Sequence, residues 1–459
     1  MSFNSLASLL LANRQGLKVA LSTDSYVDWD KFLDDIYMLL LRIKAQPCQA
    51  VAICCEDSYL FSVAFFATCY AGKKIVLPGN HQPAMLTALS PHFDLLIVDG
   101  EVAMKDEESI TLPLTSQTDK VNRIGFSFTE LDLNRSHVTL FTSGSTGAPK
   151  AINKTLLMLD AELHALERQW GQLINGTHIV STVSHQHIYG LLFRVLWPLC
   201  AGRAFASNDL TYPEQVIKNG TQEQVLISSP ALLKRLQDEG ETADYRAVFS
   251  SGGPLSKDAA TRCKTLLKQS AIEVFGSTET GGIGFRQQHD IDAVWQFFPE
   301  VKAKLMDQDC LALCSPWLTR KLSEEAGGYY QTSDQCVLLE NHKFILNGRI
   351  DRIVKIEEKR ISLLEVENHL NELEWINESA VVVIADPRRI SLGALLTLTE
   401  LGEKIQFTLG RGRFWVKLRQ ALRQWVEPVG IPRYFRVVQE IPMNKQGKRL
   451  QQEIAELFK

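Results

Sequence analysis

A nine-residue segment rich in glycine and hydroxyl side chains could bind a polyphosphate. It reads Thr142-Ser-Gly-Ser-Thr-Gly-Ala-Pro-Lys150 and directly follows the apolar run Val138–Phe141. Small residues let backbone N–H groups surround an anion, and Lys150 adds a positive charge. The spacing differs from that of the Walker loop. The sequence therefore predicts a phosphate-binding loop of another class, with a surface linker as the alternative. The loop residues are Thr142, Ser143, Gly144, Ser145, Thr146, Gly147 and Lys150.

Three further segments combine glycine, hydroxyl or acidic residues in short stretches. In Ser250-Ser-Gly-Gly-Pro-Leu-Ser256 two glycines follow an apolar run, and a flat base could lie against such a backbone, although any tight turn would also suit it. Glu279, within Phe275-Gly-Ser-Thr-Glu-Thr-Gly-Gly282, offers a carboxylate for a hard cation that bridges phosphate oxygens. A solvated loop acid is the alternative. Asp334 ends Tyr330-Gln-Thr-Ser-Asp334 and could accept hydrogen bonds from two vicinal hydroxyls.

The order of these segments, together with three more, resembles the adenylate-forming superfamily of acyl-CoA synthetases, peptide-synthetase adenylation domains and luciferases. The three are His187-Ile-Tyr-Gly-Leu191, Gly348-Arg-Ile-Asp351 and Pro442-Met-Asn-Lys-Gln-Gly-Lys448. The resemblance covers nearly the whole chain. Besides the loop 142–150, it implies a set of residues that bind ATP or AMP, namely Ser251, Gly252, Gly253, Pro254, Gly276, Ser277, Asp334 and Arg349. By the same resemblance the segment 250–256 packs against adenine, Asp334 binds the ribose hydroxyls, and Arg349 contacts ribose and phosphate.

The resemblance also implies the catalytic groups. Glu279 is expected to hold Mg²⁺, Thr278 to contact a phosphate, and Lys448 to serve the adenylation step. His187 is expected to border the acyl pocket and to gate the thiol tunnel, whereas an isolated histidine would more often be a structural core residue. Asp351 is expected to be the hinge of a rotating C-terminal domain. The expected acid pocket consists of His187, Tyr189, Phe249, Gly281, Gly282 and Ile283.

A two-step reaction follows from the resemblance. A carboxylate is a poor electrophile because its leaving group would be oxide, whereas an acyl-adenylate releases AMP. Lys448 and Mg²⁺ would neutralise the charge that builds on the α-phosphate of ATP. Rotation about the hinge would then remove Lys448 and admit a thiol, which forms a thioester. The expected cofactors are ATP and Mg²⁺, and the thiol acceptor is carrier-bound phosphopantetheine or CoA.

Three features bear on the choice of acceptor. Glu358 precedes Lys359 and Arg360 at a position where the family commonly has a glycine facing the pantetheine tunnel. The 459-residue chain is short for the family, which leaves less surface for the nucleotide end of CoA. The stretch from Gly402 to Lys459 holds twelve Lys/Arg and five Asp/Glu, a local charge of +7. It could receive an acidic carrier protein, and a solvated basic surface is the alternative.

These features favour an acyl carrier protein as the partner. From position 189 onward, no basic residue stands out as a partner for a second carboxylate and no acidic residue as a clamp for an amino group, which favours an aromatic or apolar monocarboxylic acid as the substrate. The chain looks most like the compact acyl- or aryl-acid AMP-ligases of bacterial aryl polyene-type clusters. The alternatives are a ligase that uses free CoA, a non-catalytic nucleotide-binding relative, and an unrelated kinase or ATPase, which the missing Walker loop disfavours. The identity of the acid and the oligomeric state do not follow from the sequence.

Alternating strands and helices must position these segments. The runs 50–55, 74–77 and 95–99 predict buried strands, 59–70 predicts a buried helix, and Asp30 is expected to cap a helix over 31–43. Further strands are expected at 178–182, 224–228, 247–250 and 273–275. The α/β alternation predicts a large N-terminal domain of layered mixed sheets and helices, residues 1–348, and a small mobile α+β C-terminal domain, residues 349–459.

The composition excludes several classes of protein. With 49 Lys/Arg, 53 Asp/Glu and 45% apolar residues, the chain has an ordinary globular composition, which rules out a disordered, collagen-like or coiled-coil protein. Its net charge of −4 argues against general nucleic-acid binding. Its most apolar stretch, Tyr59 to Ala71, is too short to span a bilayer. Nine scattered cysteines indicate reduced structural thiols rather than a disulfide framework. A cytoplasmic protein without a membrane span or nucleic-acid partner is therefore expected.

Overall fold

The structure is a computed structural model in which the chain forms two compact units. The first unit comprises residues 1–302 and 314–329, and the second comprises residues 303–313 and 330–459. The described residues are 2–22, 25–79, 82–100, 108–114, 123, 125–143, 149–238, 240–288, 294–319, 328–356, 359–386, 389–426, 428–443 and 449–458.

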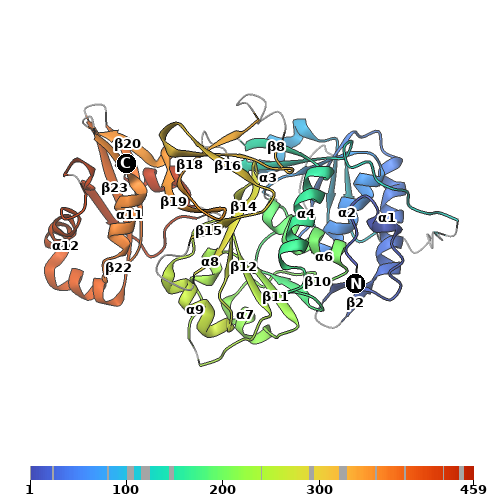
Figure 1. Ribbon diagram of the computed structural model, residues 1–459, viewed down its shortest axis with the longest axis horizontal. Helices are drawn as coiled ribbons and strands as arrows, with labels where there is room; N and C mark the ends of the chain where they lie inside the picture. Colours follow the sequence, from blue (N-terminus) through green and yellow to red (C-terminus); the bar gives the residue numbers. More distant parts are fainter. Residues whose placement is uncertain are drawn as a thin grey trace. The chain divides into compact units, whose positions relative to one another are not determined.

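A six-stranded sheet in the order β6-β5-β3-β4-β7-β8 forms one layer of the first unit. Its strands pair in parallel except for the antiparallel pair β7–β8. Helices α1 and α2 lie side by side in this part of the unit (Figure 1). The strands are β3 (Ala50–Cys54), β4 (Lys74–Leu77), β5 (Leu95–Val98), β6 (Ser109–Thr111), β7 (His137–Ser143) and β8 (Pro149–Thr155), and the helices are α1 (Trp29–Lys44) and α2 (Ser58–Tyr70).

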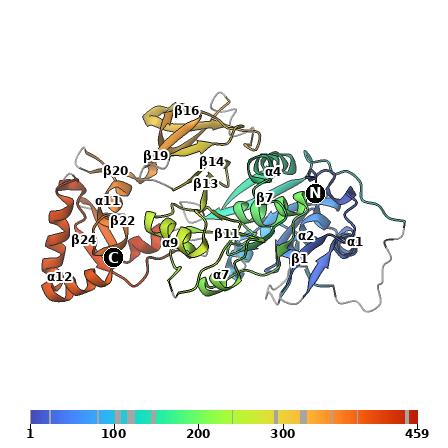
Figure 2. The same ribbon diagram turned by 60° about the horizontal axis from the view of Figure 1, so that its bottom comes forward.

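The second sheet of the first unit runs β15-β14-β13-β12-β11-β9-β10-β1-β2. The central strands β9, β11, β12 and β13 pair in parallel, and β14 turns back antiparallel to β13. Figure 2 shows α7 and α9 beside this sheet, and their apolar faces share one core with it. The strands are β1 (Lys18–Leu21), β2 (Tyr26–Asp28), β9 (His178–Ser181), β10 (Phe205–Ala206), β11 (Gln224–Ser228), β12 (Ala247–Ser250), β13 (Ile272–Ser277), β14 (Gly281–Gln287) and β15 (Trp295–Phe297).

The remaining helices of the first unit connect or cover these strands. Helix α4 follows β8 directly, and a short helical run after His187 contains a π-helical segment. The described helices are α3 (Pro83–Leu89), α4 (Leu156–Trp170), α5 (Ile188–Gly190), η3 (Leu191–Leu196), α6 (Trp197–Ala201), α7 (Pro213–Asn219), α8 (Pro230–Leu233) and α9 (Lys257–Leu267).

One predicted helix start is wrong. Helix α1 begins at Trp29, and its N-cap is Asp28, whose carboxylate accepts a hydrogen bond from the backbone N–H of Lys31 at 2.9 Å. Asp28 has the extended backbone that an N-cap needs, whereas Asp30 already lies in the first helical turn. Both aspartates precede the same apolar stripe, so the periodicity alone could not separate them.

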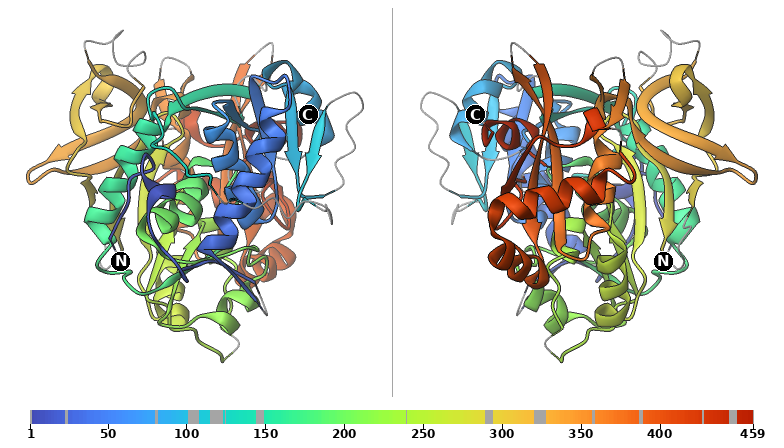
Figure 3. Two further views of the ribbon diagram at one scale, coloured as in Figure 1. Left: turned by 90° about the vertical axis from the view of Figure 1, so that its right-hand side faces the viewer. Right: turned by 90° about the vertical axis from the view of Figure 1, so that its left-hand side faces the viewer.

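The second unit contains a run of four neighbouring strands and two smaller sheets. Strands β16 (Lys302–Met306), β17 (Cys310–Cys314), β18 (Tyr330–Leu339) and β19 (Lys343–Arg349) are neighbours in that order, and β20 (Ile353–Ile356) pairs with β21 (Lys359–Ser362). A separate three-stranded sheet has the order β22-β23-β24. Figure 3 shows α11 and α12 with this sheet, and both helices share its core. Its elements are β22 (Ile376–Asp386), β23 (Arg389–Leu398), β24 (Tyr434–Val437), α11 (Leu363–Asn371), α12 (Glu400–Leu422) and α13 (Gln451–Glu456).

The division into compact units differs from the predicted domain boundary. Residues 303–313 and 330–348 belong with the C-terminal part because β17, β18 and β19 pair into one antiparallel sheet. The boundary at 348 concerns movement about a hinge, so it stays a prediction.

All nine cysteines carry free thiols, and eight of them are buried. Across the described ranges, no helix has the length and apolar character needed to cross a bilayer.

Candidate functional site

The predicted phosphate loop joins the two strands of an antiparallel hairpin. Thr142 at the end of β7 pairs with Lys150 at the start of β8, and Ser143 pairs with Pro149. The hairpin therefore brings both ends of the loop together. The expected phosphate-binding residues Gly144, Ser145, Thr146 and Gly147 lie outside the described residues.

Lys150 and Glu279 come together although 129 positions separate them in the chain. The Nζ atom of Lys150 lies 3.1 Å from Oε1 of Glu279 and donates a hydrogen bond to it. Burial raises the pKa of Glu279, but its own backbone N–H, Lys150 and Ser277 outweigh that effect and hold the pKa below its usual value. The carboxylate is therefore ionised at neutral pH.

An ionised carboxylate at this position fits a magnesium ion. Mg²⁺ is commonly bound through one or two carboxylates, with substrate phosphates and water completing its coordination. The chain offers Glu279 in this role, and the described residues contain no cluster of three His, Cys, Asp or Glu side chains that would suit an all-protein metal cage. The donor set thus fits a metal that arrives with a nucleotide.

A tight turn between β13 and β14 presents Thr278 and Glu279. Ser277 pairs with Gly281 across the turn, and the N–H of Ser277 donates to Oγ1 of Thr280 at 2.9 Å. The hydroxyl of Thr280 also donates to the carbonyl of Gly281 at 2.8 Å. A side chain on Gly276 would collide with that carbonyl, so only glycine fits there. Thr278 and Glu279 are both half-buried.

Two buried charged residues beside this turn were missed by the sequence reasoning. Lys154 on β8 donates to the backbone carbonyl of Glu279 at 2.8 Å, and Glu162 on α4 accepts from the N–H of Gly282 at 2.6 Å. Burial lowers the pKa of Lys154 to about 8 and raises the pKa of Glu162. The one sequence feature that could have indicated Lys154 is its spacing, four residues after Lys150 on the same strand.

The expected adenine-binding segment is a turn after β12. The hydroxyl of Ser251 donates to the carbonyl of Val274 at 2.8 Å, which ties the turn to β13. Gly252 has a φ of +96°, a conformation that favours glycine, and a side chain at Gly253 would meet open space. Gly252, Gly253 and Pro254 are all exposed, so this backbone is accessible to a flat ligand.

The residues expected to line the acid pocket lie in two environments. Phe249 and Ile283 are at most 1% exposed, and Phe249 packs edge-on against Trp170 with ring centroids 5.0 Å apart. Tyr189 lies 4.8 Å from Phe193 between ring centroids, and burial raises the pKa of its phenol well above the usual value. His187 is half-buried at the start of α5.

Gly281 and Gly282 lie against two side chains, Glu162 and Phe298, that the predicted acid pocket did not include. A side chain on Gly281 would lie 2.6 Å from Oε2 of Glu162, and one on Gly282 would lie 3.0 Å from the ring of Phe298. Gly281 also has a φ of +64°. These glycines therefore make room for Glu162 and Phe298, while their role in an acid pocket stays a prediction.

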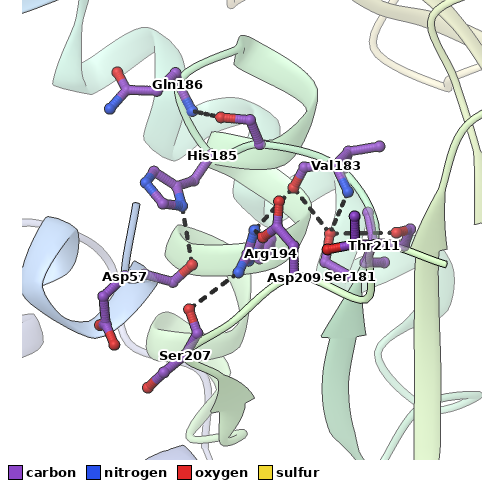
Figure 4. Close-up of polar contacts among 12 residues, drawn as sticks. Asp57, Ser181, Val183, His185, Gln186, Arg194, Ser207, Asp209 and Thr211 are labelled. Atoms are coloured by element: carbon purple, nitrogen blue, oxygen red, sulfur yellow. Dashed lines mark hydrogen bonds and ion pairs between the residues drawn. The ribbon is translucent and has the colours of Figure 1, made fainter. Parts of the chain in front are cut away.

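Buried polar contacts hold the segment that leads into His187 (Figure 4). The ring of His185 contacts the Ser58 hydroxyl at 2.9 Å and the Cys55 carbonyl at 2.8 Å. Arg194, 1% exposed, donates to the carbonyls of Val183 at 2.9 Å and Ser207 at 3.2 Å, and it forms an ion pair with Asp209. These partners fix the backbone immediately before His187.

The second unit carries the expected ribose and hinge residues. Asp334 on β18 pairs with Arg349 on β19, and Nη1 of Arg349 lies 3.4 Å from Oδ1 of Asp334. Asp351 lies in the short helix η5 (Ile350–Arg352), and nothing is described of its side chain. Lys448 and Glu358 lie outside the described residues.

The residue after Lys448 is anchored within the second unit. Arg449 forms an isolated β-bridge with Met443, and its guanidinium contacts Glu367 and Glu378 at 3.0 Å each. Glu367 is 2% exposed and also pairs with Arg352 at 2.6 Å. One buried carboxylate therefore holds arginines that neighbour both Asp351 and Lys448 in sequence.

Comparisons with known proteins agree with these motifs. Residues 12–318 match the family model described as AMP-binding enzyme. The chain is 25% identical to a 4-coumarate–CoA ligase of Halorhodospira halophila over 68% of this chain and 75% of that protein. It is 22% identical to a D-alanine–D-alanyl carrier protein ligase of Staphylococcus aureus over 99% of both chains.

A solved structure shows the same fold. ATP-bound MatB from Rhodopseudomonas palustris superposes with a TM-score of 0.80 at 18% sequence identity, over 99% of both chains. This similarity confirms the predicted fold class, a large layered α/β N-terminal part with a small C-terminal part.

Proposed function

Because the chain belongs to the AMP-binding enzyme family, we propose that it uses ATP and Mg²⁺ to activate an aromatic or apolar monocarboxylic acid and then transfers the acyl group to an acyl carrier protein. The family predicted from the motifs is confirmed, and so is the prediction of an AMP-forming acid–thiol ligase. The acid, the acceptor and the roles of single residues belong to the proposal.

The contact between Lys150 and Glu279 carries the proposal. One residue ends the predicted phosphate loop and the other is the predicted metal ligand, and their side chains lie 3.1 Å apart within the first unit. A nucleotide that placed its phosphates at Lys150 would bring a bound metal ion to Glu279. This is the arrangement that in-line transfer at the α-phosphate requires.

In the first step a carboxylate oxygen of the acid attacks the α-phosphorus of ATP, and the bond to pyrophosphate breaks. Mg²⁺, when bound, would neutralise phosphate charge during this transfer. Lys150 would hold the polyphosphate and Lys448 would supply a positive charge at the α-phosphate. In the second step a thiolate attacks the acyl carbon, a thioester forms, and AMP leaves with the electron pair.

The aromatic cluster beside His187 supports an aromatic or apolar acid. Phe193 packs against both Tyr189 and Phe249. Its ring centroid lies 4.8 Å from that of Tyr189 and 5.4 Å from that of Phe249. Tyr189 is the half-buried end of this cluster, and an aromatic acid could pack edge-on against its ring. A hydroxylated aryl acid of the aryl polyene type falls in this class.

Charge and exposure in the second unit support a carrier protein as the acceptor. The stretch from Gly402 to Lys459 has a charge of +7, and Phe407 and Trp425 on it are 93% and 65% exposed. Acidic carrier proteins suit a basic surface with exposed apolar side chains. The relatives include both a CoA ligase and a carrier protein ligase, so free CoA is the alternative acceptor. The proposed site of action is the cytoplasm, because the reaction consumes ATP.

Acid-dependent exchange of labelled pyrophosphate into ATP tests the first step. We expect exchange with some members of a panel of aryl and alkyl monocarboxylic acids, and formation of AMP rather than ADP. No exchange with any acid, together with release of ADP, would contradict the proposal. Thioester yield on holo carrier protein against free CoA tests the second step, and a strong preference for CoA would contradict the assigned acceptor.

A further inference from the structure

The turn that carries Glu279 is attached to a buried charged residue on β8. Lys154 is 1% exposed, and its Nζ atom donates to the carbonyl of Glu279 and to the carbonyl of Trp317, each at 2.8 Å. An ammonium group gives stronger hydrogen bonds than a neutral donor, and burial removes competing water. The backbone of Glu279 is therefore fixed directly by Lys154.

A second buried charge fixes the other end of the same turn. Glu162 on α4 is 4% exposed and accepts from the N–H of Gly282 at 2.6 Å. The indole N–H of Trp317 donates to the carbonyl of Gly282 at 3.1 Å. Since Lys154 also bonds Trp317, these contacts link Glu279 and Gly282 through side chains from three separate segments. The space for Glu162 exists because position 281 is a glycine.

Two lysines on one face of β8 hold the same residue at two places. Positions 150 and 154 share a strand face because side chains alternate, and Lys150 bonds the carboxylate of Glu279 while Lys154 bonds its carbonyl. Under the proposed function Lys150 bonds the polyphosphate, so it is not the group that keeps Glu279 in place. Lys154 bonds an atom that the metal ion does not need.

Burying two opposite charges is an expensive way to stabilise a fold. Replacing such a pair by apolar residues of similar size is often neutral or stabilising, since desolvation offsets much of the attraction. A role in structure alone would therefore be served at least as well by apolar side chains. What the two charged side chains add is a fixed position for the carbonyl of Glu279 and for the N–H of Gly282.

We propose that Lys154 and Glu162 are positioning residues that hold the Glu279–Gly282 turn and so aim the Glu279 carboxylate at the metal ion. The proposal rests on the proposed function, in which Glu279 binds Mg²⁺. Neither residue contacts the reacting atoms. Both act through the backbone of the turn.

The test compares Lys154→Met with Arg203→Met in the full-length chain. Arg203 is a matched control because it is also buried and pairs with a glutamate on α4, donating to Glu167 at 2.7 and 3.0 Å, yet it contacts no residue of the turn. Each variant is examined for melting temperature, for the Mg²⁺ concentration that gives half-maximal pyrophosphate exchange, and for Mn²⁺ affinity measured by electron paramagnetic resonance with a non-hydrolysable ATP analogue.

We expect Lys154→Met to raise the half-maximal Mg²⁺ concentration and to weaken Mn²⁺ binding, each by about 10-fold, with the KM for the acid changed less than about twofold. Arg203→Met is expected to lower the melting temperature without changing either metal measurement. If Lys154→Met does not fold, the double variant Lys154→Met/Glu162→Gln replaces it, because it leaves no unpaired buried charge and keeps an acceptor for Gly282.

Three results would overturn the inference. Metal binding within about twofold of wild type in a folded Lys154 variant would show a structural role only. An equal loss of metal affinity in Arg203→Met would show that loss of any buried cation beside α4 has this effect. Wild-type protein that shows no exchange with any acid would overturn the proposed function itself, which separates that failure from the other two.

Discussion

The turn that carries Glu279 and the residue that follows Lys448 are held in different ways. Glu279 lies within a buried network in the first unit, in which Lys154 and Trp317 bond the turn from separate segments. In the second unit Arg449, the residue after Lys448, forms an isolated β-bridge with Met443. Glu279 is thus held through its own backbone, whereas the contacts described in the second unit belong to Arg449, the residue after Lys448.

The two anchors also differ in exposure. Lys154 is 1% exposed, whereas the Arg449 side chain is 21% exposed and bonds a deeply buried Glu367 together with a partly buried Glu378. Glu367 also pairs with Arg352, next to the expected hinge residue Asp351. In the second unit Glu367 therefore contacts Arg449, next to Lys448, and Arg352, next to the expected hinge residue.

Loss of Lys448 should have the largest effect. Lys448→Ala is expected to lower the rate of pyrophosphate exchange at least ~10²-fold, because a charge partner of the transition state is removed. Single-turnover measurement of acyl-adenylate formation checks this. Exchange at the wild-type rate would show that Lys448 does not serve the adenylation step.

Loss of the Glu279 carboxylate should come next. Glu279→Gln keeps the size of the side chain but removes the charge, so exchange should fall roughly 10- to 100-fold and recover in part at high Mg²⁺. Titrating Mg²⁺ in the exchange assay measures both effects. A variant with the wild-type metal requirement would show that Glu279 does not bind the metal ion.

Removal of the Arg449 guanidinium, next to Lys448, should have a smaller effect on pyrophosphate exchange. Arg449→Met is expected to reduce the kcat of exchange about 10-fold with little change in metal requirement, since it acts through the position of Lys448. Arg436→Met is the control, because Arg436 lies on β24, is exposed and packs over Phe458. A change in metal requirement, or an equal loss in the control, would contradict the contrast between the two regions.

Loss of the Asp94 carboxylate, which bonds neither the Glu279 turn nor Arg449, should have the smallest effect on exchange. Asp94 accepts from the N–H groups of Gln49 and Ala50 at 2.8 and 2.9 Å, and these bonds hold its pKa below the usual value. Because the folded pKa is lower than the unfolded one, its stabilisation is present above about pH 4 and is lost as the pH falls through the folded pKa.

Asp94→Asn should therefore lower the free energy of unfolding by less than about 1 kcal/mol at pH 7, and the difference from wild type should shrink below pH 4. Urea unfolding at several pH values measures it. Exchange activity should stay at the wild-type level, and a loss there would mean that any destabilisation of the first unit lowers activity.

Much of the local structure follows from short apolar runs. The strands β4, β11 and β12 have the predicted bounds because each is a buried run flanked by polar or turn residues. The prediction fails where two neighbouring residues suit the same role, as with Asp28 and Asp30. It also ends β13 too early, because Gly276 and Ser277 have low strand propensity and extend the strand only through pairing with Gly282 and Gly281.

The sequence by itself determined the family, because glycine, hydroxyl and charged residues in a fixed order reflect the chemistry of phosphates and metal ions. It also predicts that Lys150 and Glu279 serve the same reaction. Only the tertiary structure decided that these two side chains touch, and that Lys154 and Glu162 are buried beside them. A lysine on a strand and a glutamate on a helix normally face solvent, and their burial depends on packing between residues more than a hundred positions apart.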